Sequence, residues 1–101
     1  LLALVMFEDI AALERIREIL AVPGLAGVMI GQSDLSISMG LGTPAGGAEA
    51  QNKPEVQAVV AQVGRACAEM RKLCGTYQGD IKTRVEQGFR LFTQGRGDYR
   101  E

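Results

Sequence analysis

Residues 1–34 read LLALVMFEDIAALERIREILAVPGLAGVMIGQSD, and this stretch decides the fold. The apolar run over residues 1–7 predicts a buried strand. The following apolar residues recur every three or four positions and predict an amphipathic helix that ends at Pro23-Gly24. A second apolar run, residues 26–30, predicts another buried strand. Two buried strands joined by a helix form a β-α-β unit, in which the strands run parallel.

The rest of the chain continues this alternation after a polar turn at residues 31–34. The predicted elements are a long helix from Pro54, a strand over residues 73–77, a helix capped by Asp80 and closed by Gly88, and a strand over residues 89–93. Strict alternation predicts an α/β fold with a parallel sheet. It amounts to about half of a (β/α)8 barrel, a fold that takes about 250 residues. We therefore expect these 101 residues to be a fragment.

The sequence argues against a nucleic-acid partner and against a membrane partner. The chain is 47% hydrophobic and 23% charged, with a formal net charge of −1 and its basic residues scattered. Such a chain has no phosphate-tracking surface, so we expect no nucleic-acid partner. The apolar run at residues 1–7 is too short to span a membrane and lacks the basic flank of a signal peptide, so we expect no membrane partner.

The chain has two cysteines, Cys67 and Cys74, and no histidine. Seven residues of continuous helix rise about 10 Å, whereas a disulfide needs Cα atoms within about 7 Å. We therefore expect two reduced thiols, as is typical of a cytoplasmic protein. The lack of histidine excludes an ordinary zinc site and a histidine-based triad within this chain.

A carboxylate follows each of the first two predicted strands: Glu8 after the first and Asp34 after the second. Parallel strands end at the same edge of a sheet and lie ~4.8 Å apart, so both carboxylates can reach one divalent cation. Hard oxygen ligands suit Mg²⁺ or Mn²⁺, which can polarise a 2-oxo acid as a Lewis acid. Alternatively, Glu8 is a helix-start acid and Asp34 is a turn or N-cap residue.

Residues 28–41, VMIGQSDLSISMGL, resemble a motif of the HpcH/HpaI aldolase family, and the resemblance extends to AVPG at 21–24 and PEVQA at 54–58. These proteins are metal-dependent pyruvate aldolases. The resemblance implies that residues 1–101 are the C-terminal part of a single aldolase barrel domain. It further implies that the full-length protein is a homo-oligomer that cleaves 4-hydroxy-2-oxo acids into pyruvate and an aldehyde.

The resemblance also implies roles for individual residues. Glu8 and Asp34 match the family's two metal ligands, and the backbone amides of Ser33 and Asp34 match those that receive the pyruvate carboxylate. Gly31 would permit the close backbone approach of that substrate, unless it is a simple turn glycine. The family's catalytic histidine and its arginine partner come from earlier strands. This chain would therefore contain no catalytic residue and be inactive alone.

Several positions depart from the family pattern. Asp9 replaces a small hydroxyl residue and is either a third carboxylate beside the metal or a helix cap. Tyr77 replaces an apolar pocket residue, the loop at 42–50 is longer than usual, and Arg96-Gly97-Asp98 replaces a more regular strand end. The departures at positions 9, 77 and 96–98 support one alternative, a non-catalytic scaffold homologue.

A second alternative is a relative of the citryl-CoA and malyl-CoA lyases. It would need basic residues near the loop at 40–53, where Lys53 stands alone. That glycine-rich loop is either a binding loop or a surface excursion.

Overall fold

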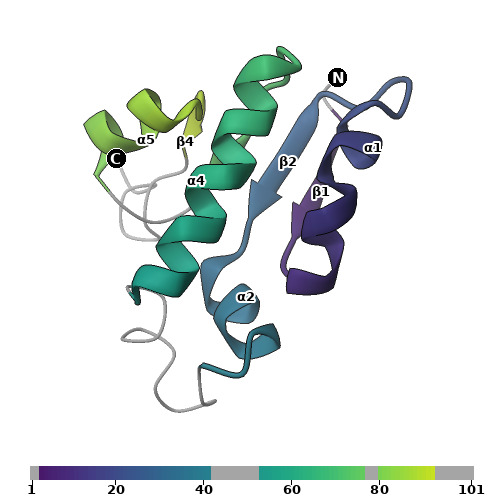
Figure 1. The fold of residues 1–101 in the computed structure, drawn as a ribbon. Helices are drawn as coiled ribbons and strands as arrows, with labels where there is room; N and C mark the ends of the chain where they lie inside the picture. The colour runs from purple at the N-terminus through teal and green to yellow at the C-terminus, as the bar shows by residue number, and fades with distance from the viewer. Residues whose placement is uncertain (1–2, 42–52, 77–79, 93–101) are drawn as a thin grey trace, which may run out of the picture.

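The computed structural model describes residues 3–41, 53–76 and 80–92. Its elements, in chain order, are β1 (Leu4–Phe7), the 3-10 helix η1 (Ile10–Arg15), α1 (Ile16–Leu20), β2 (Gly27–Ile30), α2 (Gln32–Ser38), α4 (Pro54–Glu69), β3 (Gly75–Thr76), α5 (Ile81–Gln87) and β4 (Leu91–Phe92). The strands form one parallel sheet in the order β1-β2-β3-β4 (Figure 1). The predicted α/β fold with a parallel sheet is confirmed.

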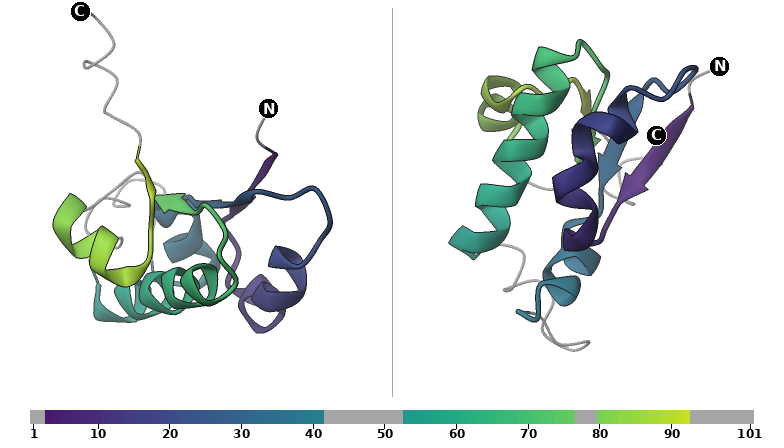
Figure 2. Two further views of the ribbon diagram at one scale, coloured as in Figure 1. Left: turned by 90° about the horizontal axis from the view of Figure 1, so that it is seen from above. Right: turned by 45° about the vertical axis from the view of Figure 1, so that its right-hand side comes forward.

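Helices α1 and α4 lie side by side against one face of this sheet (Figure 2). The core lies between the two layers, where Val28 and Ile30 of β2 pack in one cluster with the valines of α4. Because successive strand residues point to opposite faces, Met29 lies on the other face. Val28 and Ile30 therefore belong to the face of the sheet that the helices cover.

Two predicted helix starts have the capping contacts that their residue types favour. The backbone N–H of Ala11 donates to Asp9 Oδ1 over 2.9 Å, and that of Thr83 donates to Asp80 Oδ2 over 3.0 Å. Gly88 closes α5 in the left-handed region, with φ 115°. The start of η1 and both ends of α5 are therefore where the sequence predicted them.

Residues 31–34 do not form the polar turn that we expected. Gly31 alone is extended, with φ −97° and ψ 96°, and α2 begins at Gln32. The N–H of Leu35 donates to the Gly31 carbonyl over 2.9 Å, which continues the helical pattern. Asp34 lies in the first turn, where the positive end of the helix dipole favours a carboxylate. The Asp34 side chain is therefore carried by a helix.

Cys67 and Cys74 form a buried disulfide with their Cα atoms 6.2 Å apart, so the prediction of two reduced thiols was wrong. That prediction assumed a continuous helix. Helix α4 ends at Glu69 and Arg71 adopts a φ of 59°, which turns the chain back toward the helix. The two cysteines therefore no longer support the expected cytoplasmic location, because that expectation relied on free thiols.

Some expectations fall outside the described residues: the longer loop at 42–50, Tyr77, and the tripeptide at 96–98. Within the described parts of the chain, none of the helices has the length and apolar character needed to cross a membrane.

Candidate metal centre

Glu8 and Asp34 come together at the carboxyl edge of the sheet. Phe7 pairs with Ile30 at the ends of β1 and β2, so the chain leaves both strands at the same level. The N–H of Gly31 donates to the Phe7 carbonyl over 3.1 Å and extends this pairing by one step. Both strands point toward α2 (Figure 1), whose first turn places the Asp34 carboxyl within hydrogen-bond distance of Glu8.

The surroundings of Glu8 favour its protonated form. Partial burial raises the pKa of the Glu8 carboxyl above its ordinary value of 4.5, and the hydrogen bond to Asp34 and the negative charge of Asp34 raise it further. Protonation of Glu8 is therefore easier than protonation of a free glutamate side chain. Because metal ligation requires deprotonated carboxylates, a divalent cation and this proton would compete for the same oxygens.

Gly31 makes room for the Glu8 side chain. A β-carbon at position 31 would lie 2.6 Å from Glu8 Oε2 and 3.0 Å from its Cγ. The φ of Gly31 is negative, so space and not backbone conformation requires glycine here. The expected approach of a substrate to Gly31 stays a prediction, and the neighbour of Gly31 in the structure is the side chain of Glu8.

Ser33 and Asp34, the expected substrate-binding positions, lie in the first turn of α2 and are exposed. Gly31, the N-cap residue, has no side chain that could accept a hydrogen bond from the first-turn N–H groups of this helix. Gly31 and Asp34 thus contact Glu8, and Ser33 lies in the same first turn as Asp34.

Asp9 belongs to the helix cap. Its Oδ1 accepts the N–H of Ala11, which is the capping alternative considered for this residue. In residues 3–41, 53–76 and 80–92, no three or more His, Cys, Asp or Glu side chains form a group that could hold a metal ion. Among the predicted metal ligands, the structure brings only the carboxyls of Glu8 and Asp34 into contact.

Three polar residues next to this pair were not singled out from the sequence. Gln32 donates through Nε2 to Thr76 Oγ1 of β3, and its Oε1 accepts from Gln57 Nε2 of α4 over 3.2 Å. Gln32 and Thr76 are each only 2% exposed. A buried glutamine is an unusual feature, but its partners are distant in sequence, so the sequence carries no local signal for the contact.

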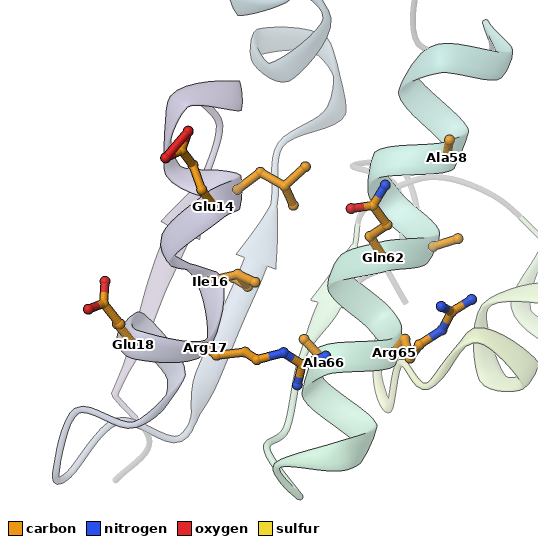
Figure 3. Close-up of a pocket in the computed structure, with 10 residues that line it drawn as sticks. Glu14, Ile16, Arg17, Glu18, Ala58, Gln62, Arg65 and Ala66 are labelled. Carbon is orange, nitrogen blue, oxygen red and sulfur yellow. The ribbon is translucent and has the colours of Figure 1, made fainter.

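A groove lies elsewhere, between the η1–α1 segment and α4 on the outer side of the helical layer. Figure 3 shows Arg17 and Gln62 extending between the two helices, while Glu14 and Glu18 point away from α4. Arg17 also pairs with Glu69 of α4 over 2.6 Å. Neither Glu8 nor Asp34 lines this groove. The ion pair that connects α1 and α4 here is between exposed side chains.

The four-stranded parallel sheet with its β/α units is the fold of part of a (β/α)8 barrel. Residues 1–84 match the model of the HpcH/HpaI aldolase/citrate lyase family, and the chain belongs to this family.

Individual relatives agree with this assignment. The chain is 38% identical over 78 residues to the hydroxypyruvate/pyruvate aldolase of Cupriavidus necator, a match that covers 76% of this chain and 26% of that protein. The crystal structure of an HpcH/HpaI aldolase from Desulfitobacterium hafniense DCB-2 matches with a TM-score of 0.75 and 25% identity, over 90% of this chain and 34% of that one.

The same fold occurs in the citrate synthase SbnG, with a TM-score of 0.78 and 22% identity over 96% of this chain and 39% of that one. This likeness concerns the fold alone. The chain thus spans between a quarter and two fifths of the length of these relatives. Four parallel strands correspond to about half of the eight in the barrel.

Proposed function

We propose that this chain supplies the metal-binding part of a divalent-cation-dependent aldolase that cleaves 4-hydroxy-2-oxo acids into pyruvate and an aldehyde. The observation that carries the proposal is the contact between the Glu8 and Asp34 carboxyls in a member of the aldolase/citrate lyase family. The name of the Cupriavidus necator relative supports a 2-oxo acid substrate.

The residues present suit Mg²⁺ or Mn²⁺. Both donors are carboxylates, which are hard ligands, and the missing β-carbon at position 31 leaves room for the Glu8 side chain in its observed position. Glu8 and Asp34 would hold the ion, and the chemistry that a bound ion supplies is stabilisation of negative charge on a keto oxygen. The N–H groups of Ser33 and Asp34 would receive the carboxylate of the same substrate, which fixes its orientation.

Proton transfer is not assigned to this chain. It contains no histidine, and the Asp9 side chain is occupied in a cap. A general base must reach the proton that it removes, so in this proposal the base comes from another part of the whole protein. The chain alone would then bind the ion and the 2-oxo acid without turning over an aldol substrate.

Two alternatives remain for the whole protein, because family membership covers lyases as well as aldolases. A citryl-CoA or malyl-CoA lyase relative would use the same two acids but accept a thioester substrate. A non-catalytic homologue would have no use for the ion. Assembly into a homo-oligomer and a cytoplasmic location are further parts of the proposal, to be tested by sedimentation and by cell fractionation.

The first experiment measures Mn²⁺ binding to the 101-residue chain by titration with electron paramagnetic resonance detection of free Mn²⁺. We expect binding that Glu8→Gln and Asp34→Asn each weaken by tenfold or more, because each removes one of two charged ligands. Glu14→Gln, a change to an exposed acid on η1, is the matched control and should leave binding unchanged. Absence of binding in the wild-type chain would refute the proposal.

The second experiment uses the whole protein that contains this chain, with Mg²⁺ or Mn²⁺ and a panel of substrates. Pyruvate release from 4-hydroxy-2-oxo acids, lost on removal of the metal, supports the aldolase. Cleavage of a CoA thioester without action on the free acids would point to the lyase alternative. Metal binding without either reaction would favour the scaffold.

A further inference from the structure

Gln32 is a buried amide placed two residues before Asp34. Its side chain reaches away from the sheet edge in two directions, to the hydroxyl of Thr76 on β3 and to the amide of Gln57 in the first turns of α4. Gln32 and Thr76 are both 2% exposed, so water cannot replace either partner at low cost. The start of α2 is therefore hydrogen-bonded to α4 and β3, which lie more than twenty residues further along the chain.

The other end of α2 is also fastened. Ser38 Oγ accepts the N–H of Ile10 over 2.9 Å and donates to the Leu35 carbonyl over 2.7 Å. Ile10 lies two residues after Glu8, so this contact ties the end of α2 to the segment that carries the first carboxylate. Helix α2 thus has one polar attachment at each end.

These attachments determine where Asp34 can lie. Asp34 shares a helical turn with Gln32, so a rotation or slide of α2 that moved Asp34 would break the buried hydrogen bonds of Gln32. A helix of seven residues has little stability of its own and takes its position from such contacts. Neither Glu8 nor Asp34 is one of these hydrogen-bond partners of Gln32.

We propose that Gln32 is a positioning residue, which through Thr76 and Gln57 fixes the start of α2 and so holds Asp34 against Glu8 in the arrangement that binds a divalent cation. The inference rests on the proposed function, in which these two carboxylates are the metal ligands. In this proposal the hydrogen bonds of Gln32 with Thr76 and Gln57 set the distance between the two ligands. Those ligands, Glu8 and Asp34, belong to different elements.

A purely structural role would give a different result. If the network only satisfied a buried amide, its loss would lower the free energy of unfolding and leave the folded chain with normal affinity for Mn²⁺. If the network sets the position of Asp34, its loss changes the affinity and the Mn²⁺ spectrum of chain that is still folded. The metal measurement therefore separates the two roles.

The test compares Thr76→Val with Thr76→Ser. Valine keeps the shape of threonine and removes the hydroxyl, whereas serine keeps the hydroxyl. With Mn²⁺ alone as the probe, we expect Thr76→Val to weaken binding by fivefold or more and to broaden the spectrum of the bound ion, and Thr76→Ser to stay within twofold of the wild type. Gln57→Leu, which removes the other partner from a less buried position, should also weaken binding.

Val63→Ala supplies a control for general loss of stability. Val63 is fully buried in the core and is no part of the Gln32 network, so this change should destabilise the chain without altering Mn²⁺ affinity. Equal weakening by Val63→Ala would overturn the inference, as would unchanged affinity and spectrum in both Thr76→Val and Gln57→Leu. If Thr76→Val fails to fold, the Mn²⁺ affinity and spectrum of Gln57→Leu alone test the inference. A wild-type chain that binds no Mn²⁺ would refute the proposed function itself.

Discussion

The carboxylate of Glu8 occupies the space in which a β-carbon of Gly31 would lie, with 2.6 Å between that carbon and Oε2. One residue follows β1 and the other follows β2, so this fit depends on the register Phe7↔Ile30. Glycine at position 31 thus leaves room for the glutamate that follows β1. The pair is therefore one unit, and it can be tested as one.

Replacing Gly31 by alanine should displace Glu8 and leave the fold intact. The atom in the way is the end of a flexible side chain, so we expect a stability loss of about 1 kcal/mol and Mn²⁺ binding weakened by tenfold or more. Urea unfolding and Mn²⁺ titration measure the two effects. In a Glu8→Ala background the same substitution should cost clearly less stability, since the clash is gone. Equal costs in both backgrounds would show that Glu8 does not occupy this space.

Glu8→Gln should stabilise the metal-free chain at neutral pH. The raised pKa means that the folded state holds the Glu8 proton more tightly than the unfolded state does. The resulting stabilisation is fully present below the unfolded pKa and is lost as pH rises through the folded one. Glutamine keeps a donor and has no charge to repel Asp34, so we expect a gain of about 0.2–1 kcal/mol at pH 7.

Urea unfolding from pH 4 to pH 8 in the presence of EDTA measures this gain. The difference between Glu8→Gln and the wild type should grow with pH, whereas Glu14→Gln, at an exposed position, should show no such trend. A difference that stays constant across this range would contradict the contact between the two carboxyls.

Asp9→Asn should leave metal affinity unchanged. Asparagine caps helices about as well as aspartate, so the contact with the N–H of Ala11 survives while the negative charge is lost. We expect Mn²⁺ affinity within twofold of the wild type and a thermal midpoint within a few degrees. A marked fall in affinity at constant stability would mean that Asp9 contributes to the metal site after all.

Much of the architecture was predictable from local pattern. The positions of the strands, the caps at Asp9 and Asp80, and the parallel order follow from hydrophobic periodicity and turn residues, which act over a few positions. The expected burial of the first strand was wrong, because Leu4, Val5 and Met6 are exposed. The approach of Glu8 and Asp34 was predictable too, since any two parallel neighbours end at one edge. Local pattern and sheet topology are sufficient for these features.

Other features depend on contacts between distant residues. Gln32 meets Thr76 and Gln57 only after three elements have packed, and nothing near Gln32 in sequence marks it as buried. The disulfide was missed because its formation depends on the reversal at Arg71, a residue type that rarely adopts a positive φ. Long-range packing and an unusual backbone angle therefore explain these two omissions, whereas the turn expected at residues 31–34 was a local misassignment of the start of α2.

Reduction of the Cys67–Cys74 disulfide should destabilise the chain. The bond closes a short loop, with a sequence separation of 7, for which the chain-entropy relation gives about 2 kcal/mol. We expect dithiothreitol to lower the urea midpoint of the wild type and to leave a Cys67→Ala/Cys74→Ala variant unaffected. Since both cysteines are fully buried, alkylation should require reduction. Rapid alkylation of the untreated native chain would show that the bond is absent.

Strand β1 should make the isolated chain self-associate. Among the described strands, β1 is at the end of the sheet order, and Leu4 and Val5 are 37% and 44% exposed. An apolar strand at the edge of a sheet is a site at which another copy can pair. Sedimentation velocity should therefore show concentration-dependent oligomers, which Val5→Lys reduces by placing a charge on the edge. Val22→Lys is the matched control, because Val22 is 49% exposed but lies outside the sheet. A wild-type chain that stays monomeric at every concentration, with a single sharp thermal transition, would show that this edge is protected.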